Sequence, residues 1–98
     1  MKLVRDLIPR IIEEGGKTCK YYVAKYDEYK VRLYEKMREE LDEFIDMPCY
    51  EEAADMYEVL LAICDLHELN IESVARWASV KKMQRGGFSD RVILDMVD

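Results

Sequence analysis

The stretch REELDEFIDMPCYEEAAD, residues 38–55, decides the fold because a single proline separates two acidic helical segments. Before the proline, apolar residues recur at helical spacing: Leu33, Met37, Leu41 and Phe44. This spacing predicts a long helix with one apolar face over about residues 27–46. Pro48 ends that helix and begins a second one over about residues 49–68. Because the connection is short, we expect the two helices to be antiparallel neighbours.

Negative charge is concentrated in the same region. Between Arg38 and Arg76 the chain has no lysine or arginine but many acids, which are Glu39, Glu40, Asp42, Glu43, Asp46, Glu51, Glu52, Asp55, Glu58, Asp65, Glu68 and Glu72. A helical hairpin ordinarily mixes lysines with its acids to relieve repulsion. The absence of lysines here indicates that something else neutralises the charge.

Length and composition limit the class of protein. The chain has 98 residues, enough for one domain over residues 1–98, and its 50% hydrophobic and 37% charged residues favour a folded globular chain. A net charge of −6 argues against binding to nucleic-acid polymers, whose phosphates require a basic surface. No apolar run approaches the ~20 residues of a membrane span. The three cysteines have no CxxC spacing, so we expect a cytoplasmic protein with reduced thiols and no membrane contact.

Two further helices are expected outside the acidic hairpin. One lies within residues 2–17, capped by Asp6 and stopped by the glycines at 15–16. The other covers residues 71–85 and is closed by the glycines at 86–87. Four helices in a chain of this length predict a helical bundle.

The remaining expectations concern caps and strands. Asp27 is expected to cap the first long helix, and Asn70 is expected to end the second. Tyr21–Val23 and Arg91–Asp95 have strand character and could pair, although two short strands alone are marginal. The predicted fold class is therefore all-α, with antiparallel long helices and one short two-stranded β element.

Two acids of the second long helix are expected on its buried face. Val59, Ile63 and Leu66 form the inner stripe of this helix. At 100° per residue, Glu52 and Asp55 continue that stripe and do not point to solvent.

Two acids of the first long helix are expected to meet them. Glu40 borders the apolar stripe, and Glu43 stands beside it. Counting residues from the turn places Glu43 opposite Glu52 and Glu40 opposite Asp55, in two facing layers.

Four ionised carboxylates at an apolar seam repel one another, and desolvation increases the cost. Either several pKa values rise or a divalent cation binds. Ligands that are all oxygen suit Mg²⁺ or Mn²⁺. The alternative is an ordinary solvated acidic surface, with acids near a helix start favoured by the macrodipole.

The acidic pattern resembles a known family. EELDE (residues 39–43) followed by EEAAD (residues 51–55) is similar to the ExxE…ExxD signature of the all-α, MazG-like nucleoside triphosphate pyrophosphohydrolases. KLVRDLIPRIIEEGGK (residues 2–17) and KKMQRGGF (residues 81–88) resemble its phosphoribosyl-ATP pyrophosphohydrolase-like subgroup. The turn between the two acidic motifs is short here, so family members with long loops are poor templates for the substrate pocket.

The resemblance implies Mg²⁺-dependent cleavage between the α- and β-phosphates of a nucleotide. It implies metal ligands at Glu40, Glu43, Glu52 and Asp55. Glu39 would be a helper that orients the attacking water, so Glu39 and Glu40 are the candidate catalytic residues. It also implies homo-oligomers, commonly dimers or tetramers, in which helices of different subunits build the site.

Basic residues at two places could meet the substrate phosphates not reached by metal. They are Lys81, Lys82 and Arg85 before the Gly86–Gly87 turn, and Lys2 and Arg5 near the start. A solvated helix end, where the dipole favours cations, is the alternative role of the first group.

Three functions remain open from the sequence. The first is a house-cleaning pyrophosphohydrolase that removes unwanted nucleotides. The second keeps the fold and metal but uses phosphoribosyl-ATP in histidine biosynthesis. The third is a noncatalytic helical module whose acidic face binds a basic partner.

Overall fold

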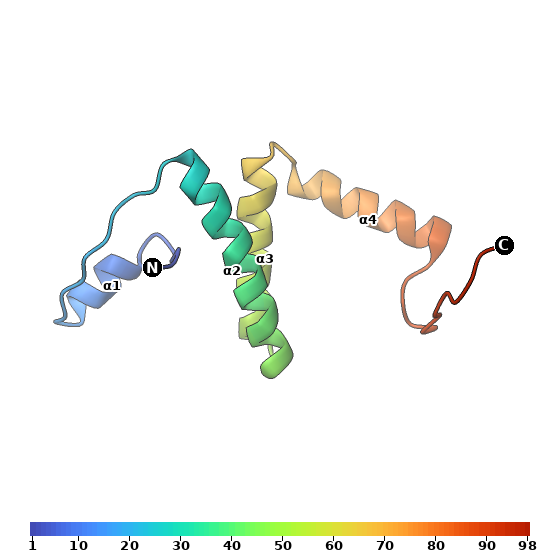
Figure 1. Ribbon diagram of the computed structural model, residues 1–98, viewed down its shortest axis with the longest axis horizontal. Coiled ribbons are helices and arrows are strands. Elements are labelled where there is room, and N and C mark those ends of the chain that lie inside the picture. Colours follow the sequence, from blue (N-terminus) through green and yellow to red (C-terminus); the bar gives the residue numbers. More distant parts are fainter. The chain divides into compact units, whose positions relative to one another are not determined.

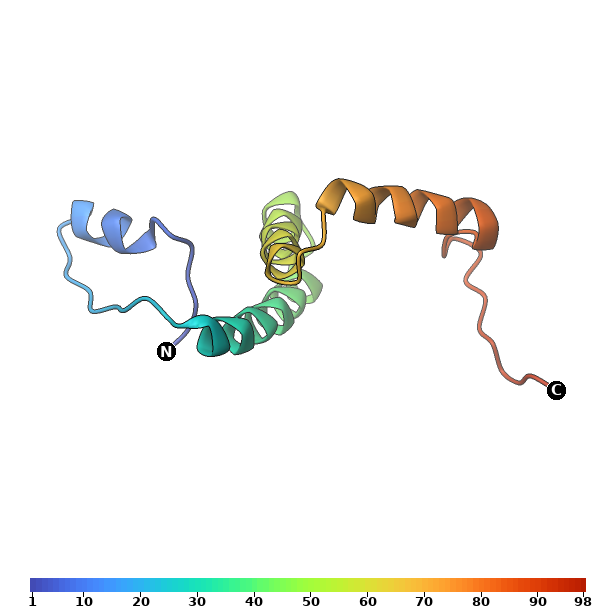
Figure 2. The same cartoon turned by 90° about the horizontal axis from the view of Figure 1, so that it is seen from above.

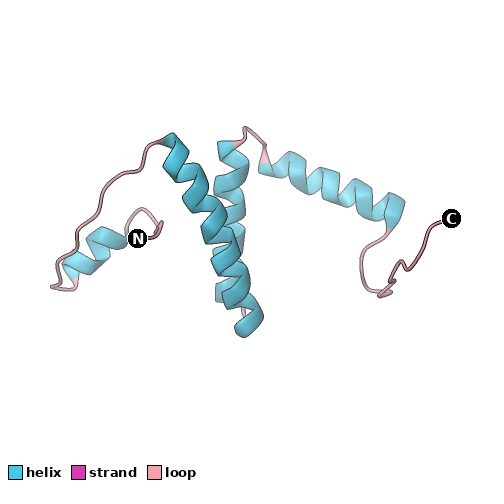
Figure 3. Cartoon of the chain, in the orientation of Figure 1, coloured by secondary structure: helices cyan, strands magenta, loops and turns pink.

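The computed structural model describes residues 1–98 and contains four helices and no strand (Figures 1 and 3). The helices are α1 (Ile8–Glu14), α2 (Tyr26–Asp46), α3 (Tyr50–Leu66) and α4 (Ile71–Arg85). The prediction of an all-α chain is confirmed. None of these helices combines the length and the apolar composition that crossing a membrane requires.

The helices α2 and α3 form the packed centre of the first of two compact units, Met1–Glu68 and Leu69–Asp98. They run antiparallel and side by side in both views (Figures 1 and 2). Pro48 lies in the three-residue connection between Asp46 and Tyr50, as predicted. The buried hydrophobic residues of the chain lie on these two helices: Leu33 on α2, and Val59 and Cys64 on α3.

The predicted caps of the first two helices are wrong. The N-cap of α1 is Leu7, one residue after Asp6, and the N-cap of α2 is Lys25; neither makes a side-chain capping bond. Asp27 instead lies in the first turn of α2, where an acid is favoured by the helix dipole without making a capping bond. The predicted stop of α1 is correct, because Gly15 follows its last residue and Gly16 has a φ of +83°, which favours glycine.

Asn70 begins a helix and does not end one, so this prediction is also wrong. The helix α3 ends at Leu66 with His67 as its C-cap. The side chain of Asn70 accepts a 3.0 Å hydrogen bond from the backbone N–H of Ser73, in the manner of an N-cap. The bounds predicted for α4 and its end at Gly86, with a φ of +82°, agree with the structure.

The predicted two-stranded β element is wrong. Tyr21–Val23 and Arg91–Asp95 contain no strand residues. Val23 is 89% exposed and Ile93 is 88% exposed, so neither segment has an apolar layer to pack against. Two short strands without such a layer are only marginally stable in water, because they bury too little apolar surface.

Candidate metal centre

Three of the predicted ligands meet across the α2–α3 pair. One carboxylate oxygen from each of Glu40, Glu52 and Asp55 lies within 4.8 Å of the others. Glu40 is on the inner face of α2, while Glu52 and Asp55 are three residues apart and share the inner face of α3. Antiparallel packing of the two helices brings these faces together, as the sequence predicts.

A second carboxylate group lies along α2 and shares Glu40 with the first. It comprises Glu39, Glu40 and Glu43, which are close because they are neighbours on one helical surface. The predicted pairing in two layers therefore differs from the structure. Glu40 meets both Glu52 and Asp55 of α3, whereas Glu43 is grouped with acids of its own helix. Glu43 is exposed, whereas Glu39 is half-buried.

Glu40 is the only buried charged residue, with 5% of its surface exposed. Its Oε2 atom is buried without a hydrogen-bond partner, and so is Oε2 of Glu52. Burial raises the pKa of Glu40, against a hydrogen bond from Lys36 that lowers it, and the charges of Glu43 and Asp55 raise it further. Two buried oxygens without donors are costly in a folded protein, and a bound cation would satisfy both.

Lys36 is a site residue that the sequence analysis missed. Its Nζ atom lies 3.3 Å from Oε1 of Glu40 and 3.5 Å from Oε1 of Glu39. Burial opposes ionisation of Glu39, but Lys36 and Lys2 more than offset it, and the pKa of Glu39 is lowered. The i,i+3 and i,i+4 spacing from Lys36 could have revealed these pairs. Lys36 precedes the interval between Arg38 and Arg76, so the charge pattern of that interval does not reveal it.

Lys2 and Arg5, predicted to bind substrate, contact the acidic residues in this structure. Nζ of Lys2 is 3.4 Å from Oε1 of Glu39, and Nη2 of Arg5 is 2.7 Å from Oδ1 of Asp55. The hydrogen bond to Asp55 raises the pKa of Arg5 above its ordinary value. Three cations from outside the acidic stretch therefore neutralise part of its charge, which the sequence analysis did not foresee.

The other predicted phosphate ligands are exposed residues near the end of α4, in the unit Leu69–Asp98. They are Lys81, Lys82 and Arg85. Basic residues in the last turn of a helix complement its dipole, which accounts for Lys82 and Arg85 without a ligand. Their contact with phosphate stays a prediction.

The set of candidate metal ligands fits a hard divalent cation. Its members are all carboxylates, they come from two packed helices, and two of them, Glu40 and Glu52, each have an oxygen that is buried without a protein donor. Mg²⁺ and Mn²⁺ prefer such oxygen ligands, whereas zinc sites generally contain histidine or thiolate. The only histidine, His67, pairs instead with Tyr34, whose hydroxyl is 2.7 Å from Nε2.

Comparison of the chain with models of protein families, with curated proteins and with solved structures gives no match. The resemblance to MazG-like pyrophosphohydrolases therefore stays a prediction from the two acidic motifs and their flanks.

Proposed function

We propose that this chain is a MazG-like, Mg²⁺-dependent nucleoside triphosphate pyrophosphohydrolase of the cytoplasm. It would cleave the α–β phosphoanhydride to give a nucleoside monophosphate and pyrophosphate. The observation that carries the proposal is the meeting of Glu40, Glu52 and Asp55 across two helices, with two buried oxygens that lack donors. A surface that merely carries solvated acids would not bury them.

The position of each residue indicates its role in the proposed reaction. Glu40, Glu52 and Asp55 would hold the cation, with Glu43 as a further ligand from the adjacent turn of α2. When bound, Mg²⁺ neutralises phosphate charge and lowers the pKa of coordinated water. Glu39 lies in the neighbouring group, and its lowered pKa keeps it ionised, so that it can accept a hydrogen bond from the attacking water and orient it.

The positive side chains would bind the phosphates that the metal does not reach. Lys2 and Arg5 already lie beside the carboxylates, so a phosphate at the metal would be within the reach of flexible basic side chains. Lys81, Lys82 and Arg85 are the second candidate group. The same geometry would serve phosphoribosyl-ATP, whose cleaved bond is of the same type.

Pyrophosphate release across a nucleotide panel tests this function. With Mg²⁺, we expect release from at least one canonical or modified nucleoside triphosphate, or from phosphoribosyl-ATP, and the monophosphate as co-product. Chelation of the metal should abolish release, because the carboxylates alone would repel the phosphates. The preferred substrate separates the house-cleaning role from the biosynthetic one. No release from any nucleotide by the folded protein, with no Mg²⁺ uptake, would instead favour the acidic interaction module.

A homo-oligomer is part of the proposal. On the side of α3 roughly opposite the stripe of Val59, Ile63 and Leu66, this helix carries a second apolar stripe with the 4–3–4–3 spacing of a coiled-coil seam. Its members are Tyr50, Ala54, Tyr57, Leu61 and Cys64. Tyr50 is 97% exposed and Tyr57 is 55% exposed. A helix that is apolar on two sides is favoured when both are buried, which a second copy of the chain would achieve.

Light scattering tests the oligomer. We expect a dimer, or a tetramer built from such dimers, and dissociation to monomer in Tyr57→Glu, because a buried unpaired carboxylate costs several kcal/mol. Tyr21→Glu is the matched control, since Tyr21 is 61% exposed and lies outside the stripe. A monomeric wild-type chain at all concentrations would contradict this part of the proposal.

A further inference from the structure

The N-terminal segment, residues 1–7, lies against the α2–α3 pair and brings two positive charges to the candidate metal centre. Its contacts span the chain: Lys2 reaches Glu39 on α2, and Arg5 reaches Asp55 on α3. The Arg5–Asp55 distance of 2.7 Å is that of a direct, charge-assisted hydrogen bond. The segment therefore connects both helices that carry the carboxylates.

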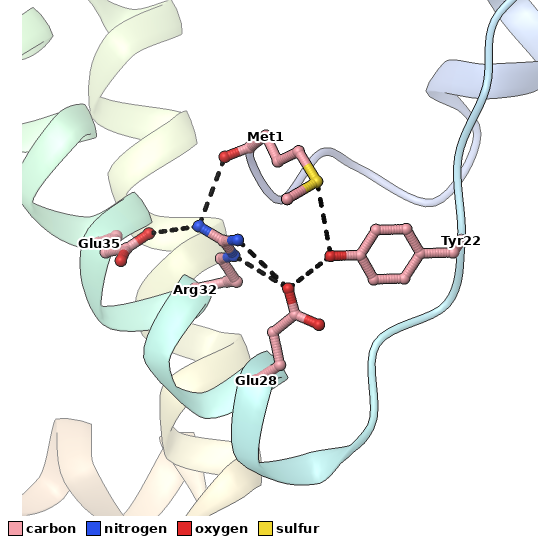
Figure 4. Close-up of polar contacts among 5 residues, drawn as sticks. All are labelled: Met1, Tyr22, Glu28, Arg32 and Glu35. Carbon is pink, nitrogen blue, oxygen red and sulfur yellow. Dashed lines mark hydrogen bonds and ion pairs between the residues drawn. The ribbon is translucent and has the colours of Figure 1, made fainter.

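Met1, the first residue of this segment, makes contacts that do not involve the carboxylates of the candidate metal centre (Figure 4). Nη1 of Arg32 donates to the carbonyl oxygen of Met1 at 3.5 Å, and the hydroxyl of Tyr22 lies 3.8 Å from the Met1 sulfur. Glu28 orders both donors, because it accepts from Tyr22 at 2.6 Å and from Arg32 at 3.3 Å. The hydrogen bond to Glu28 raises the pKa of Tyr22 and keeps it a donor. The contacts of Met1 therefore do not involve Asp55, the partner of Arg5.

Arg5 and a divalent cation compete for the same carboxylate. Asp55 is both the acceptor of the Arg5 hydrogen bond and one of the three carboxylates that converge with Glu40 and Glu52. A dication at this centre would repel a guanidinium in direct contact with one of its ligands. The two positive groups are therefore alternative counter-ions of Asp55.

We propose that residues 1–7 form an ionic latch in which Arg5 holds Asp55 until a divalent cation displaces it. This rests on the metal centre of the proposed function and adds a regulatory step to it. Because linkage is reciprocal, metal binding must loosen the segment by the same factor by which the segment weakens metal binding. Displacement leaves Arg5 beside the metal and free to pair with a phosphate, so its substrate contact depends on the metal.

The expected change in Mg²⁺ affinity follows from the solvent exposure of the Arg5–Asp55 pair. The side chain of Arg5 is 56% exposed and that of Asp55 is 32% exposed, so solvent screens their attraction. Ion pairs of this kind contribute about 0.2–1 kcal/mol. Removing Arg5 should therefore tighten Mg²⁺ binding by about 1.4- to fivefold.

Calorimetric titration with MgCl₂ tests the latch in the full chain. We expect Arg5→Gln to lower the Kd for Mg²⁺ by this factor. Arg10→Gln removes the same charge from an exposed position on α1 and should leave the Kd at the wild-type value. An unchanged Kd in Arg5→Gln would overturn the latch. A higher Kd would also overturn it, since Arg5 would then position Asp55 for the metal.

Hydrogen exchange supplies a readout that does not depend on activity. In the wild type, the backbone amide of Ile8, which donates to the Arg5 carbonyl at 3.1 Å, should exchange faster with Mg²⁺ than with chelator, and in Arg5→Gln this difference should disappear. Wild-type protein that takes up Mg²⁺ with no change in the exchange of this amide would overturn the latch and leave the proposed function standing. Wild-type protein that takes up no Mg²⁺ would overturn both.

Discussion

Glu52→Gln is expected to lower Mg²⁺ affinity and pyrophosphate release by at least about 100-fold. The loss of a residue that only hydrogen-bonds a metal ligand already costs up to about 100-fold in affinity or activity, and Glu52 is itself a proposed ligand. Glu52 belongs to the converging group, and its Oε2 atom is buried without a donor. An amide in its place has one oxygen and no charge, so it neutralises a cation poorly. Fold and helix content should be unchanged, because the substitution preserves shape.

The adjacent Glu51 provides the control. It lies in the same first turn of α3 and is exposed, so it makes the same contribution to the helix dipole without facing α2. Glu51→Gln should keep the wild-type Mg²⁺ affinity and activity. Calorimetry and pyrophosphate release measure both variants. Equal losses in the two would mean that overall negative charge, not a defined centre, attracts the metal.

Glu40→Gln should have opposite effects on stability and on metal binding. Burial raises the pKa of Glu40, so ionising it in the metal-free protein is unfavourable. Glutamine removes that charge and offers an N–H₂ donor to the neighbouring carboxylates. We expect the free energy of unfolding at pH 7, measured by urea with chelator present, to rise by about 1 kcal/mol, the net contribution of one hydrogen bond.

The pH dependence has a definite sign. Because the folded pKa lies above the ordinary value of 4.5, the group's contribution to stability is fully present below pH 4.5 and is lost as pH rises through the folded pKa. The advantage of Glu40→Gln over wild type should therefore grow from pH 4 to pH 7. Saturating Mg²⁺ should reverse the order, because only wild type binds it tightly. A variant that is less stable than wild type at pH 7 without metal would show that the Lys36 contact outweighs the burial cost.

The helices themselves could be predicted from local patterns. Apolar spacing indicated α2 and α3, Pro48 located the turn between them, and glycine marked the end of α4. Each of these signals acts within a few residues, so the sequence displays it directly. The same locality explains why Glu52 and Asp55 were correctly assigned to the inner face.

The caps and the strands were harder to predict. Asp27 and Asn70 are both residue types that cap helices well. Helix bounds predicted from sequence are uncertain by one or two residues, and in the structure Asp27 lies in the first turn of α2 and Asn70 caps the start of α4. Tyr21–Val23 has strand composition, yet a strand requires a partner and an apolar layer, which composition does not supply.

The sequence by itself determined an acidic, antiparallel helix pair with carboxylates on its buried side, because helical periodicity relates position along the chain to position around the helix. Only the tertiary structure decided that Lys2 and Arg5 meet carboxylates of this helix pair. Lys2 and Arg5 are 37 and 50 residues from their partners, and their contacts depend on the path of the N-terminal segment across α2 and α3. No local pattern encodes that path, since it results from packing among segments distant in sequence.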